Sequence, residues 1–508
     1  MAATFRHLAR GFAILRILAR HDALQPDPRL NLPVGASFGL AAFNLLFGRR
    51  QPGLRRGEKL AAALAELGPA FIKLGQVLSV RPDLVGEDLA NDLGQLRDRL
   101  PPFAWSDAKA LLEAELGSDV EHLYVGFEPE AVAAASVAQV HFAETPAGDP
   151  LAVKLLRPGV EDAFARDLAL FAWAADLAET YLPGMARLRP GDVARLVADQ
   201  VAIELDLRLE AAAASELAEN FLNDPDLLVP KVDWNRTARR VLSLQRIDGI
   251  RIEDRAALLA AGHDLPALAQ RVIHVFLRQA LRDGYFHADM HHGNLFVLQD
   301  GRLGLVDFGI MGRLSLKDRR FMAEMLGAFL SGDWRKAARV HFEAGYVPAD
   351  RDPELFAQAC RSIGEPIRDK PVAEISIGRL LAQLFQITET FGMPTQPHLL
   401  LLQKTMVTVE GVARSLDPQV NFWDAARPEV EGWARENLGP EAHIREAANE
   451  ALAMLRRIPT LLQGLEDRLA QPPAPAPIVS SPPKGRQNLT HWLLGLIAAL
   501  LALGLLLD

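Results

Sequence analysis

Apolar residues recur every three or four positions through most of this chain, which is the spacing of one face of an α-helix. The pattern predicts helices over residues 58–80 and 89–100, and a series of amphipathic helices over residues 315–469 that prolines interrupt. Short apolar runs typical of strands occur in the middle of the chain, at residues 124–127, 138–143 and 151–155. We therefore expect an α+β protein that is mainly helical.

Two apolar segments near the N-terminus differ from this pattern. Residues 5–24 predict a basic amphipathic helix, which could lie on an anionic membrane surface or pack on the next domain. Residues 34–47 are apolar and are followed by arginines. That run is too short to span a bilayer, which needs about 20 residues. It therefore predicts an interfacial or buried helix.

The C-terminal segment predicts attachment to a membrane. A Pro-rich linker, residues 471–489, precedes an uncharged apolar run over residues 492–507. At about 1.5 Å per residue that run is about 24 Å long, and local thinning of the bilayer can compensate for the shortfall. Lys484 and Arg486 precede the run, so the rest of the chain is predicted to be cytoplasmic. We expect residues 490–508 to form a transmembrane or membrane-anchoring helix.

Length and charge narrow the possible functions. A chain of 508 residues is too long for one hydrophobic core, so two or three domains are expected. The net charge of −9, without a basic stripe that interleaves aromatic residues, argues against nucleic-acid binding. Cys360 is the single cysteine, which excludes an intrachain disulfide and favours a reducing compartment.

Two polar clusters, separated by a short hairpin, carry the chemistry. The first has the spacing His-x-Asp-x-x-x-x-Asn of a protein-kinase catalytic loop, from His287 to Asn294. The second, Asp307-Phe308-Gly309, follows where a kinase holds its metal ion. Asp289 would face the group that accepts the phosphoryl, while Asn294 and Asp307 would bind Mg²⁺ between the phosphates. A zinc site at His291 and His292 is disfavoured, because adjacent histidines cannot easily converge on one ion.

Upstream of these clusters, alanines replace the glycines of a kinase phosphate loop. The register Gly-x-Gly-x-x-Gly-x-Val is occupied by Ala133, Ala134, Ala135, Ser136, Val137, Ala138, Gln139 and Val140. Lys154 lies fourteen residues after Val140, on the strand where a kinase keeps the lysine that contacts the α and β phosphates. We expect these residues to bind ATP.

Further charged residues lie at helical spacing. Lys73 and Gln76 are three apart and share a helix face, and Gly75 between them permits close approach of another segment. Asp206 and Glu210 are four apart, which predicts two carboxylates on one face of one helix. Lys154 and Lys73 would supply the cationic partners of these carboxylates.

Together these residues resemble the UbiB family of atypical kinase-like (aarF-domain) proteins, which are linked to ubiquinone metabolism. The resemblance covers residues 58–313. The matching motifs are Lys73–Gln76, Ala133–Ala138, Val153-Lys154, Glu204-Leu205-Asp206, Glu210-Ala211, the His287–Asn294 loop and Asp307-Phe308-Gly309. Two departures are Met290 and His292, which stand where the family usually has prolines and leave the catalytic loop without their stiffening.

The resemblance implies a protein-kinase-like two-lobe fold with an N-terminal helical extension over the active site. It implies that Glu204 and Asp206 meet the helix of Lys73 and Gln76 as a lid, and that Glu210 pairs with Lys154. The expected domains are N-terminal helices (1–57), the helical extension (58–110), an N-lobe (111–249), a C-lobe (250–430), C-terminal helices (431–470), the linker (471–489) and the membrane helix (490–508).

The implied function is ATP-dependent support of ubiquinone biosynthesis, with ATP and Mg²⁺ as cofactors. ATP would be hydrolysed or would phosphorylate a lipid-like acceptor. The implied partners are a membrane lipid or prenylated quinone precursor, ubiquinone-biosynthesis proteins and a second copy of the chain, at a bacterial inner membrane. An alternative is an ATP-gated lipid-binding or complex-organising protein. A true protein kinase is disfavoured, because five residues separate Gly309 from the helix start at Ser315 and leave no room for an activation segment.

Overall fold

The structure is a computed structural model that describes residues 2–24, 43–49, 51, 53–79, 85–94, 96, 101–181, 190–368, 387, 390–393 and 396–437. The chain divides into a unit Met1–Gly439 and a unit Pro440–Asp508, and the second lies outside the described residues. The expected linker 471–489 and membrane helix 490–508 fall in that second unit. In the part of the chain that the structure describes, no helix is long and apolar enough to cross a membrane.

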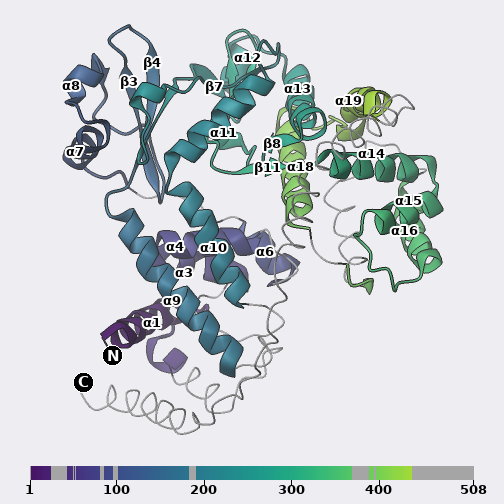
Figure 1. Cartoon of the computed structure of the whole chain (residues 1–508), viewed down its shortest axis with the longest axis horizontal. Helices are drawn as coiled ribbons and strands as arrows, with labels where there is room; N and C mark the ends of the chain where they lie inside the picture. The colour runs from purple at the N-terminus through teal and green to yellow at the C-terminus, as the bar shows by residue number, and fades with distance from the viewer. Residues whose placement is uncertain are drawn as a thin grey trace, which may run out of the picture. The chain divides into compact units, whose positions relative to one another are not determined.

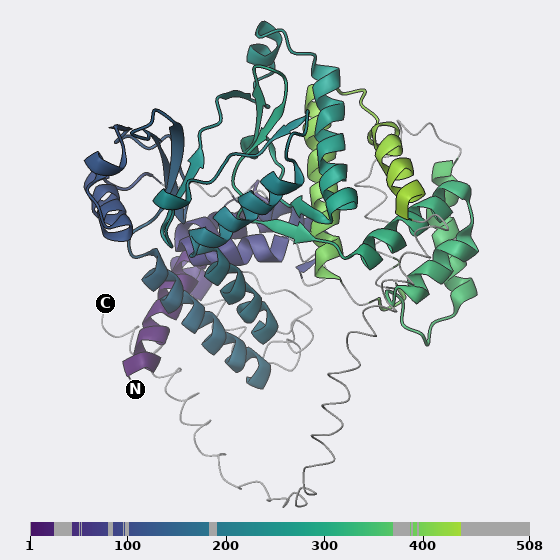
Figure 2. The ribbon, with the colours of Figure 1, turned by 45° about the horizontal axis from the view of Figure 1, so that its top comes forward.

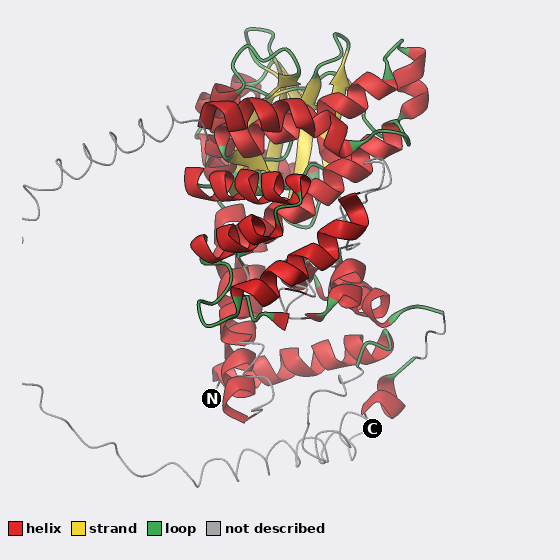
Figure 3. Cartoon of the chain, turned by 90° about the vertical axis from the view of Figure 1, so that its right-hand side faces the viewer, coloured by secondary structure: helices red, strands yellow, loops and turns green. Residues whose placement is uncertain are grey.

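The first unit is mainly helical, with strands confined to its middle (Figures 1 and 3). The α-helices are α1 (Ala2–Arg20), α3 (Arg56–Leu67), α4 (Pro69–Ser79), α6 (Glu87–Leu93), α7 (Trp105–Leu116), α8 (Val120–Leu123), α9 (Val160–Tyr181), α10 (Pro190–Glu204), α11 (Leu207–Asn220), α12 (Arg255–Ala260), α13 (Leu265–Leu277), α14 (Leu316–Ser331), α15 (Trp334–Glu343), α16 (Pro353–Arg368), α18 (Pro397–Leu416) and α19 (Phe422–Asn437). Shorter turns are η2 (Trp234–Arg236), the π-helical η3 (Arg278–Asp283) and η4 (His292–Asn294). The strands are β1 (Gly126–Phe127), β2 (Ala133–Ala134), β3 (Ala138–Glu144), β4 (Pro150–Leu156), β5 (Leu227–Leu228), β6 (Val241–Gln245), β7 (Gly249–Arg251), β8 (Tyr285–His287), β9 (Leu295–Leu298), β10 (Leu303–Leu305) and β11 (Met311–Arg313).

An antiparallel sheet carries Lys154, one of the candidate site residues. Its order is β1-β3-β4-β6, and β2 pairs with β3. Side chains alternate along β4, so Val153 and Leu155 are buried on one face with α7 and α8, which lie beside the sheet in Figure 1. Lys154 therefore projects from the opposite face, in register with Val140 of β3 and Leu242 of β6.

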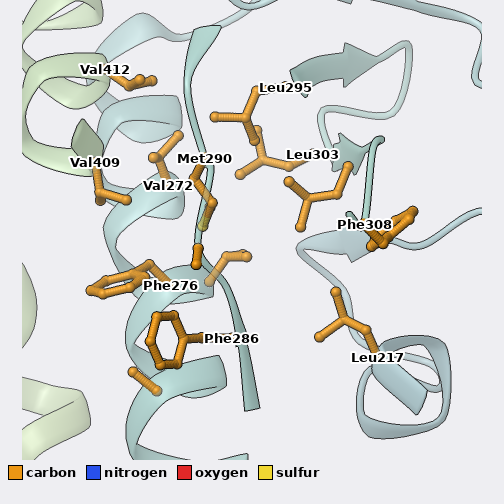
Figure 4. Close-up of a cluster of buried hydrophobic side chains, with 14 of the residues drawn as sticks. Leu217, Val272, Phe276, Phe286, Met290, Leu295, Leu303, Phe308, Val409 and Val412 are labelled. Atoms are coloured by element: carbon orange, nitrogen blue, oxygen red, sulfur yellow. The ribbon is translucent and has the colours of Figure 1, made fainter. Parts of the chain in front are cut away.

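A helical region carries the two motif-bearing hairpins. Helix α13 packs against α18 and α19, and its apolar face is almost wholly buried. The strand β9 pairs with β10, while β8 pairs with β11 in a separate two-stranded ribbon. Figure 4 shows the cluster beneath them, where Phe276, Phe286, Met290 and Phe308 pack with aliphatic residues from several elements. This buried cluster is the platform on which the catalytic-loop motif lies.

The N-terminal helices α1, α3, α4 and α6 pack together beside α9 and α10 and form the extension (Figures 1 and 2). A Cβ atom added at Gly75 would come within 2.3 Å of Leu96 and 2.9 Å of Leu64, so the glycine permits the close approach that its position predicts. Phe71 of α4 meets Phe171 of α9 edge to face, with ring centroids 4.9 Å apart. The extension is therefore a packed part of the first unit.

The structure distinguishes between several sequence expectations. Helix α1 packs against α3, which agrees with the packing interpretation of the basic N-terminal helix. Of the expected helix 34–47, only residues 43–47 are described; they are helical, and within them Phe43 is buried while Leu45 and Leu46 are exposed. The helix expected over residues 89–100 is described as Glu87–Leu93. The capping box at Ser315, with Asp318, is confirmed as the start of α14.

Candidate active site

His287 fixes the geometry of the catalytic-loop motif. Its ring is buried at the end of β8, where Nε2–H donates to the main-chain oxygen of Asp307 at 2.8 Å. Its Nδ1 accepts the main-chain N–H of Asp289 at 3.1 Å. Burial lowers the pKa of His287, although the carboxylates of Asp289 and Asp307 oppose this shift. The neutral ring therefore joins the two polar clusters through one donor and one acceptor.

Asn294 closes the same loop from its other end. Its Nδ2 donates to the main-chain oxygen of Asp289 at 3.0 Å, and the residue is buried in the single turn η4. His291 supports this turn, since its Nδ1 accepts the N–H of Gly293 at 2.9 Å. The Asp289 side chain remains 34% exposed, with its Oδ2 3.6 Å from His291 Nε2. The loop thus holds Asn294 inward and leaves the Asp289 carboxylate accessible.

Asp307 adopts a backbone conformation that few residues other than glycine adopt. Its φ is +64°, in the left-handed region where Asp is better tolerated than most non-glycine residues. The next side chain, Phe308, is buried and meets the His287 ring edge to face at 5.7 Å. This turn directs the half-exposed Asp307 carboxylate toward the sheet, where Oδ1 lies 3.0 Å from Lys154 Nζ.

Lys154 joins the sheet, helix α11 and the Asp-Phe-Gly turn. Its Nζ donates to both oxygens of Glu210, at 2.8 and 2.9 Å, in addition to Asp307. Burial would lower the pKa of Lys154, but the Asp307 and Glu210 carboxylates outweigh it and raise that pKa above its ordinary value. The Lys154 ammonium in turn holds the pKa of Asp307 below its ordinary value, while burial raises the pKa of Glu210 to about 7. The Lys154–Glu210 pair that the resemblance implies is present.

The expected lid contact is made by one acidic residue. Lys73 of α4, which is buried, and Glu204 at the end of α10, whose side chain is 13% exposed, form an ion pair with a Nζ–Oε2 distance of 2.6 Å. Gln76 lies further along α4, half-buried, and its main-chain oxygen accepts from Ser79 Oγ. The extension is therefore tied to the helix that precedes α11 and Glu210.

The expectation for Asp206 was wrong. Asp206 lies in the break between α10 and α11, where it caps α11 by accepting the N–H of Arg208 at 3.1 Å. Its carboxylate also pairs with the Arg208 guanidinium at 2.6–2.8 Å. Asp206 and Glu210 consequently do not share one helix face. Asp206 pairs with Arg208, whereas the expectation was that it meets the helix of Lys73 and Gln76.

The Ala-rich loop, residues 133–138, connects β2 to β3 in the sheet. Ala133 and Ala134 pair with Val140 and Gln139, and the N–H of Ala135 donates to the main-chain oxygen of Ala138 at 2.8 Å. The loop is therefore a tight β-turn connection. It stands on the strand that neighbours Lys154, as a phosphate loop would.

The donor set fits Mg²⁺ better than a transition metal. Asn294 donates through Nδ2, so its Oδ1 and the carboxylate of Asp307 are the atoms that could bind a metal ion; oxygen ligands suit Mg²⁺. Within the described residues, no group of three His, Cys, Asp or Glu side chains converges. The rings of His291 and His292 contact different partners, since His292 Nε2 lies 2.9 Å from Ser415 Oγ.

Two residues that support the loop belong to no recognisable sequence motif. The fully buried Gln279, in η3, accepts the main-chain N–H of His287 at 2.8 Å. Thr405 of α18 donates to the main-chain oxygen of Ala288 at 3.1 Å. Both contacts join segments distant in the sequence, and the only local signal was a polar residue on an otherwise apolar helix face.

Comparisons with known proteins agree with this geometry. A family model described as the ABC1 atypical kinase-like domain matches residues 95–341, and a model described as the UbiB helical domain matches residues 360–421. The chain is 41% identical over 487 residues to a protein of Marinobacter nauticus named probable protein kinase UbiB, covering 95% of this chain and 87% of that protein. A protein of the same name from Azotobacter vinelandii is 41% identical over 464 residues, covering 90% and 85% of the two chains.

A solved structure shows the same fold at lower identity. It is described as the complex of Rv3197 with erythromycin from Mycobacterium tuberculosis, and it is 24% identical to this chain with a TM-score of 0.50. The match covers 79% of this chain and 98% of that one. At this level of identity the likeness supports the fold alone.

Proposed function

This chain belongs to the UbiB family of atypical kinase-like proteins, with a mainly helical kinase-like fold, and we propose that it binds ATP with Mg²⁺ to support ubiquinone biosynthesis. The observation that carries the proposal is the contact of Lys154 with both Glu210 and Asp307. It brings together the lysine, helix glutamate and Asp-Phe-Gly aspartate that a kinase aligns for phosphoryl transfer.

Each residue has a role that follows from its position. Lys154 would contact the α and β phosphates, while Asn294 and Asp307 would hold Mg²⁺, which neutralises charge on the phosphates. Asp289, partly exposed on the same loop, would accept the proton of the attacking hydroxyl or water. The Ala-rich loop would cover the phosphates. Phosphoryl transfer requires positioning and charge stabilisation above all, and this arrangement supplies both.

The acceptor is proposed to be water or a small lipid-like molecule. After Gly309, strand β11 pairs at once with β8, and α14 begins after Ser315. A protein kinase needs a long activation segment between these points to dock its peptide substrate. The shortness of this connection favours ATP hydrolysis or lipid phosphorylation over peptide phosphorylation.

A second candidate is an ATP-gated lipid-binding or complex-organising protein. The Lys73–Glu204 pair favours it, because it ties the extension to α10, and α10 packs against α11, the helix that carries Glu210. A nucleotide that displaced Lys154 from Glu210 would then act on the helix next to the one that the extension contacts. In this case hydrolysis would reset conformation and leave no phosphorylated product.

One experiment separates these possibilities. Purified full-length protein is incubated with γ-labelled ATP, Mg²⁺ and a membrane lipid extract, and mass spectrometry locates the label. Label on a lipid supports the kinase, whereas free phosphate whose release rises only with lipid supports the gated binder. Absence of both nucleotide binding and phosphate release in the wild-type protein would contradict the proposed function.

We also propose attachment to a bacterial inner membrane, with the kinase-like part in the cytoplasm. The apolar run of residues 492–507 supports a C-terminal anchor. A second, weaker contact is supported by the N-terminal surface, where Leu45 is 86%, Leu46 61% and Phe12 47% exposed. Residues 1–57 contain nine arginines and two aspartates in a chain of net charge −9, which suits an anionic lipid surface.

Truncation tests this attachment. Removal of residues 490–508 should move the protein toward the soluble fraction and preserve nucleotide binding. High salt should release the truncated protein from membranes much more than the full chain, because the remaining contact depends on arginines. A truncated protein that stays with membranes in high salt would place the anchor elsewhere, with residues 34–47 as the next segment to remove.

A further inference from the structure

Arg157 holds the Ala-rich loop at two points. It follows β4, three residues after Lys154, and its main-chain N–H donates to the oxygen of Val137 at 2.8 Å. Its side-chain Nε donates to the main-chain oxygen of Ala135, also at 2.8 Å. One residue therefore fixes two positions of the loop, and it does so from directly after the strand that carries Lys154.

The same guanidinium reaches the segment that leads out of the extension. Its Nη2 donates to the main-chain oxygen of Pro101 at 2.7 Å, and its Cζ lies 5.8 Å from the Phe103 ring centroid. Residues 101–103 connect the extension to α7 of the sheet region. Arg157 thus bridges a loop and a connecting segment that are about 30 residues apart in the sequence.

Gln139 makes a second bridge between the same two segments. Its side chain is buried at the start of β3, directly after the loop. Oε1 accepts the main-chain N–H of Phe103 at 2.8 Å, and Nε2 lies 3.4 Å from the oxygen of the same residue. The side-chain amide therefore pairs with the Phe103 backbone as a neighbouring strand would.

We propose that Arg157 and Gln139 form a latch that couples the Ala-rich loop to residues 101–103, so that the positions of the loop and of the extension depend on one another. Arg157 is the positioning residue of this latch. The inference rests on the proposed function in one respect: the loop must lie over the phosphates of a bound nucleotide. A nucleotide that shifts the loop then also shifts residues 101–103. By linkage the coupling is reciprocal, so a change in the position of the extension alters the affinity for nucleotide.

The latch requires arginine in particular. A planar guanidinium offers several N–H donors in a fixed fork and can serve two carbonyl oxygens at once, whereas a lysine ammonium is a point charge on a flexible stem. Arg157→Lys keeps the positive charge and removes the fork. Arg236→Lys is the matched control, because Arg236 also donates through Nε to a main-chain oxygen, that of Leu123 at 2.8 Å, and lies over the Tyr124 ring.

The Phe103 amide is a natural reporter. Pro101 and Pro102 have no N–H, so the first exchangeable amide of the connecting segment is the one that Gln139 accepts. In the full-length protein without nucleotide, Arg157→Lys should accelerate amide exchange of both Phe103 and the Ala-rich loop about tenfold, the effect of losing one charge-assisted hydrogen bond. Arg236→Lys should leave both unchanged. Equal exchange of Phe103 in Arg157→Lys and wild type overturns the latch.

Nucleotide supplies the test of coupling. In the wild type, saturating ATP with Mg²⁺ should change exchange in the loop and at Phe103 together; in Arg157→Lys it should still change the loop but no longer Phe103. A nucleotide effect on Phe103 that survives this substitution overturns the coupling. Failure of the proposed function looks different, since the wild-type loop itself would then not respond to nucleotide.

Gln139→Ala provides a second variant in case Arg157→Lys does not fold. It removes the acceptor of the Phe103 N–H directly, so Phe103 exchange must rise, and coupling predicts that exchange of Ala135 rises with it. Acceleration confined to Phe103 would show two independent contacts and overturn the proposal.

Discussion

The catalytic loop is held mainly by apolar packing, whereas the extension and the Ala-rich loop also depend on polar bridges. The catalytic loop lies on a buried apolar cluster, where Phe286, Met290 and Phe308 are almost fully enclosed. The extension and the Ala-rich loop reach the same cluster through Phe71 and Val137, and they also make polar bridges between distant segments, Lys73–Glu204 for the extension and Arg157–Ala135 for the loop. Apolar packing fixes one geometry, whereas a few polar bridges can be exchanged at modest cost. The proposed chemistry therefore lies on the rigid region, and its proposed control lies on the exchangeable bridges.

The largest effect is expected at the rigid region. Asp307→Asn removes the carboxylate that contacts Lys154 and that would bind Mg²⁺, so phosphate release should fall by about three orders of magnitude. The buried cluster beneath it is untouched, so the protein should remain folded, with a melting temperature lowered only by the loss of the ion pair with Lys154. Steady-state phosphate release and a thermal melt measure the two quantities.

A matched control keeps this test specific. Asp300 is a half-exposed carboxylate in the turn between β9 and β10 and pairs with Arg302 at 2.7 Å. Asp300→Asn should leave phosphate release unchanged. Turnover in Asp307→Asn equal to that of Asp300→Asn would remove Asp307 from the proposed site.

Site residues could be predicted from the sequence where the chemistry is local in the chain. The spacing from His287 to Asn294 and the Asp-Phe-Gly turn identified two clusters that the structure brings together through His287. The prediction failed for Asp206, because a four-residue spacing was taken as one continuous helix although Asp is also a preferred N-cap residue. Gln279 and Arg157 could not be found in this way, since their partners are set by tertiary packing.

The second effect concerns the attachment of the extension. Lys73→Ala leaves the largely enclosed Glu204 carboxylate without its cationic partner, with the Gln200 amide still donating to it, which should lower the free energy of local opening of the extension by about 3 kcal/mol. The observable is faster amide exchange over residues 58–100. Lys109→Ala is the control, because Lys109 pairs with Glu121 at the exposed surface and such pairs contribute at most about 1 kcal/mol. Unchanged protection in Lys73→Ala would show that packing alone holds the extension.

The third effect is a dependence on pH in the polar region. His141 of β3 is buried. Its Nδ1–H donates to the main-chain oxygen of Glu128 at 2.8 Å, and its Nε2 accepts from the side-chain amide of Gln139 at 2.9 Å. Burial lowers the pKa of His141 below its ordinary value near 6.5, although the hydrogen bond to Glu128 opposes this. The unfolded chain then binds the proton more tightly, so stability should fall as the pH drops below about 6.5.

Urea unfolding at pH 7 and pH 5.5 measures this dependence. The His141 contribution should be about 1 kcal/mol lower at pH 5.5, and His141→Gln should remove that part of the pH dependence. His341→Gln is an informative comparison, because His341 is buried in α15 and the pKa of its ring is also lowered by burial. Exchange of Phe103 should respond to His141→Gln and not to His341→Gln. The opposite pattern would separate His141 from the support of the loop.

The smallest effect is expected at the Ala-rich loop itself. Ala135 has no left-handed backbone conformation for glycine to relieve, since the positive-φ residues other than glycine in the described chain are Asp22, Asn223 and Asp307. Ala135→Gly therefore adds backbone freedom without removing strain, which destabilises the loop by about 0.5–1 kcal/mol. Loss of the Cβ also permits closer approach of the backbone to a phosphate, so nucleotide affinity should change by a few-fold. Calorimetric titration with ATP and with ADP, each with Mg²⁺, measures this change. If both affinities and phosphate transfer equal those of the wild type, the loop does not lie over the phosphates.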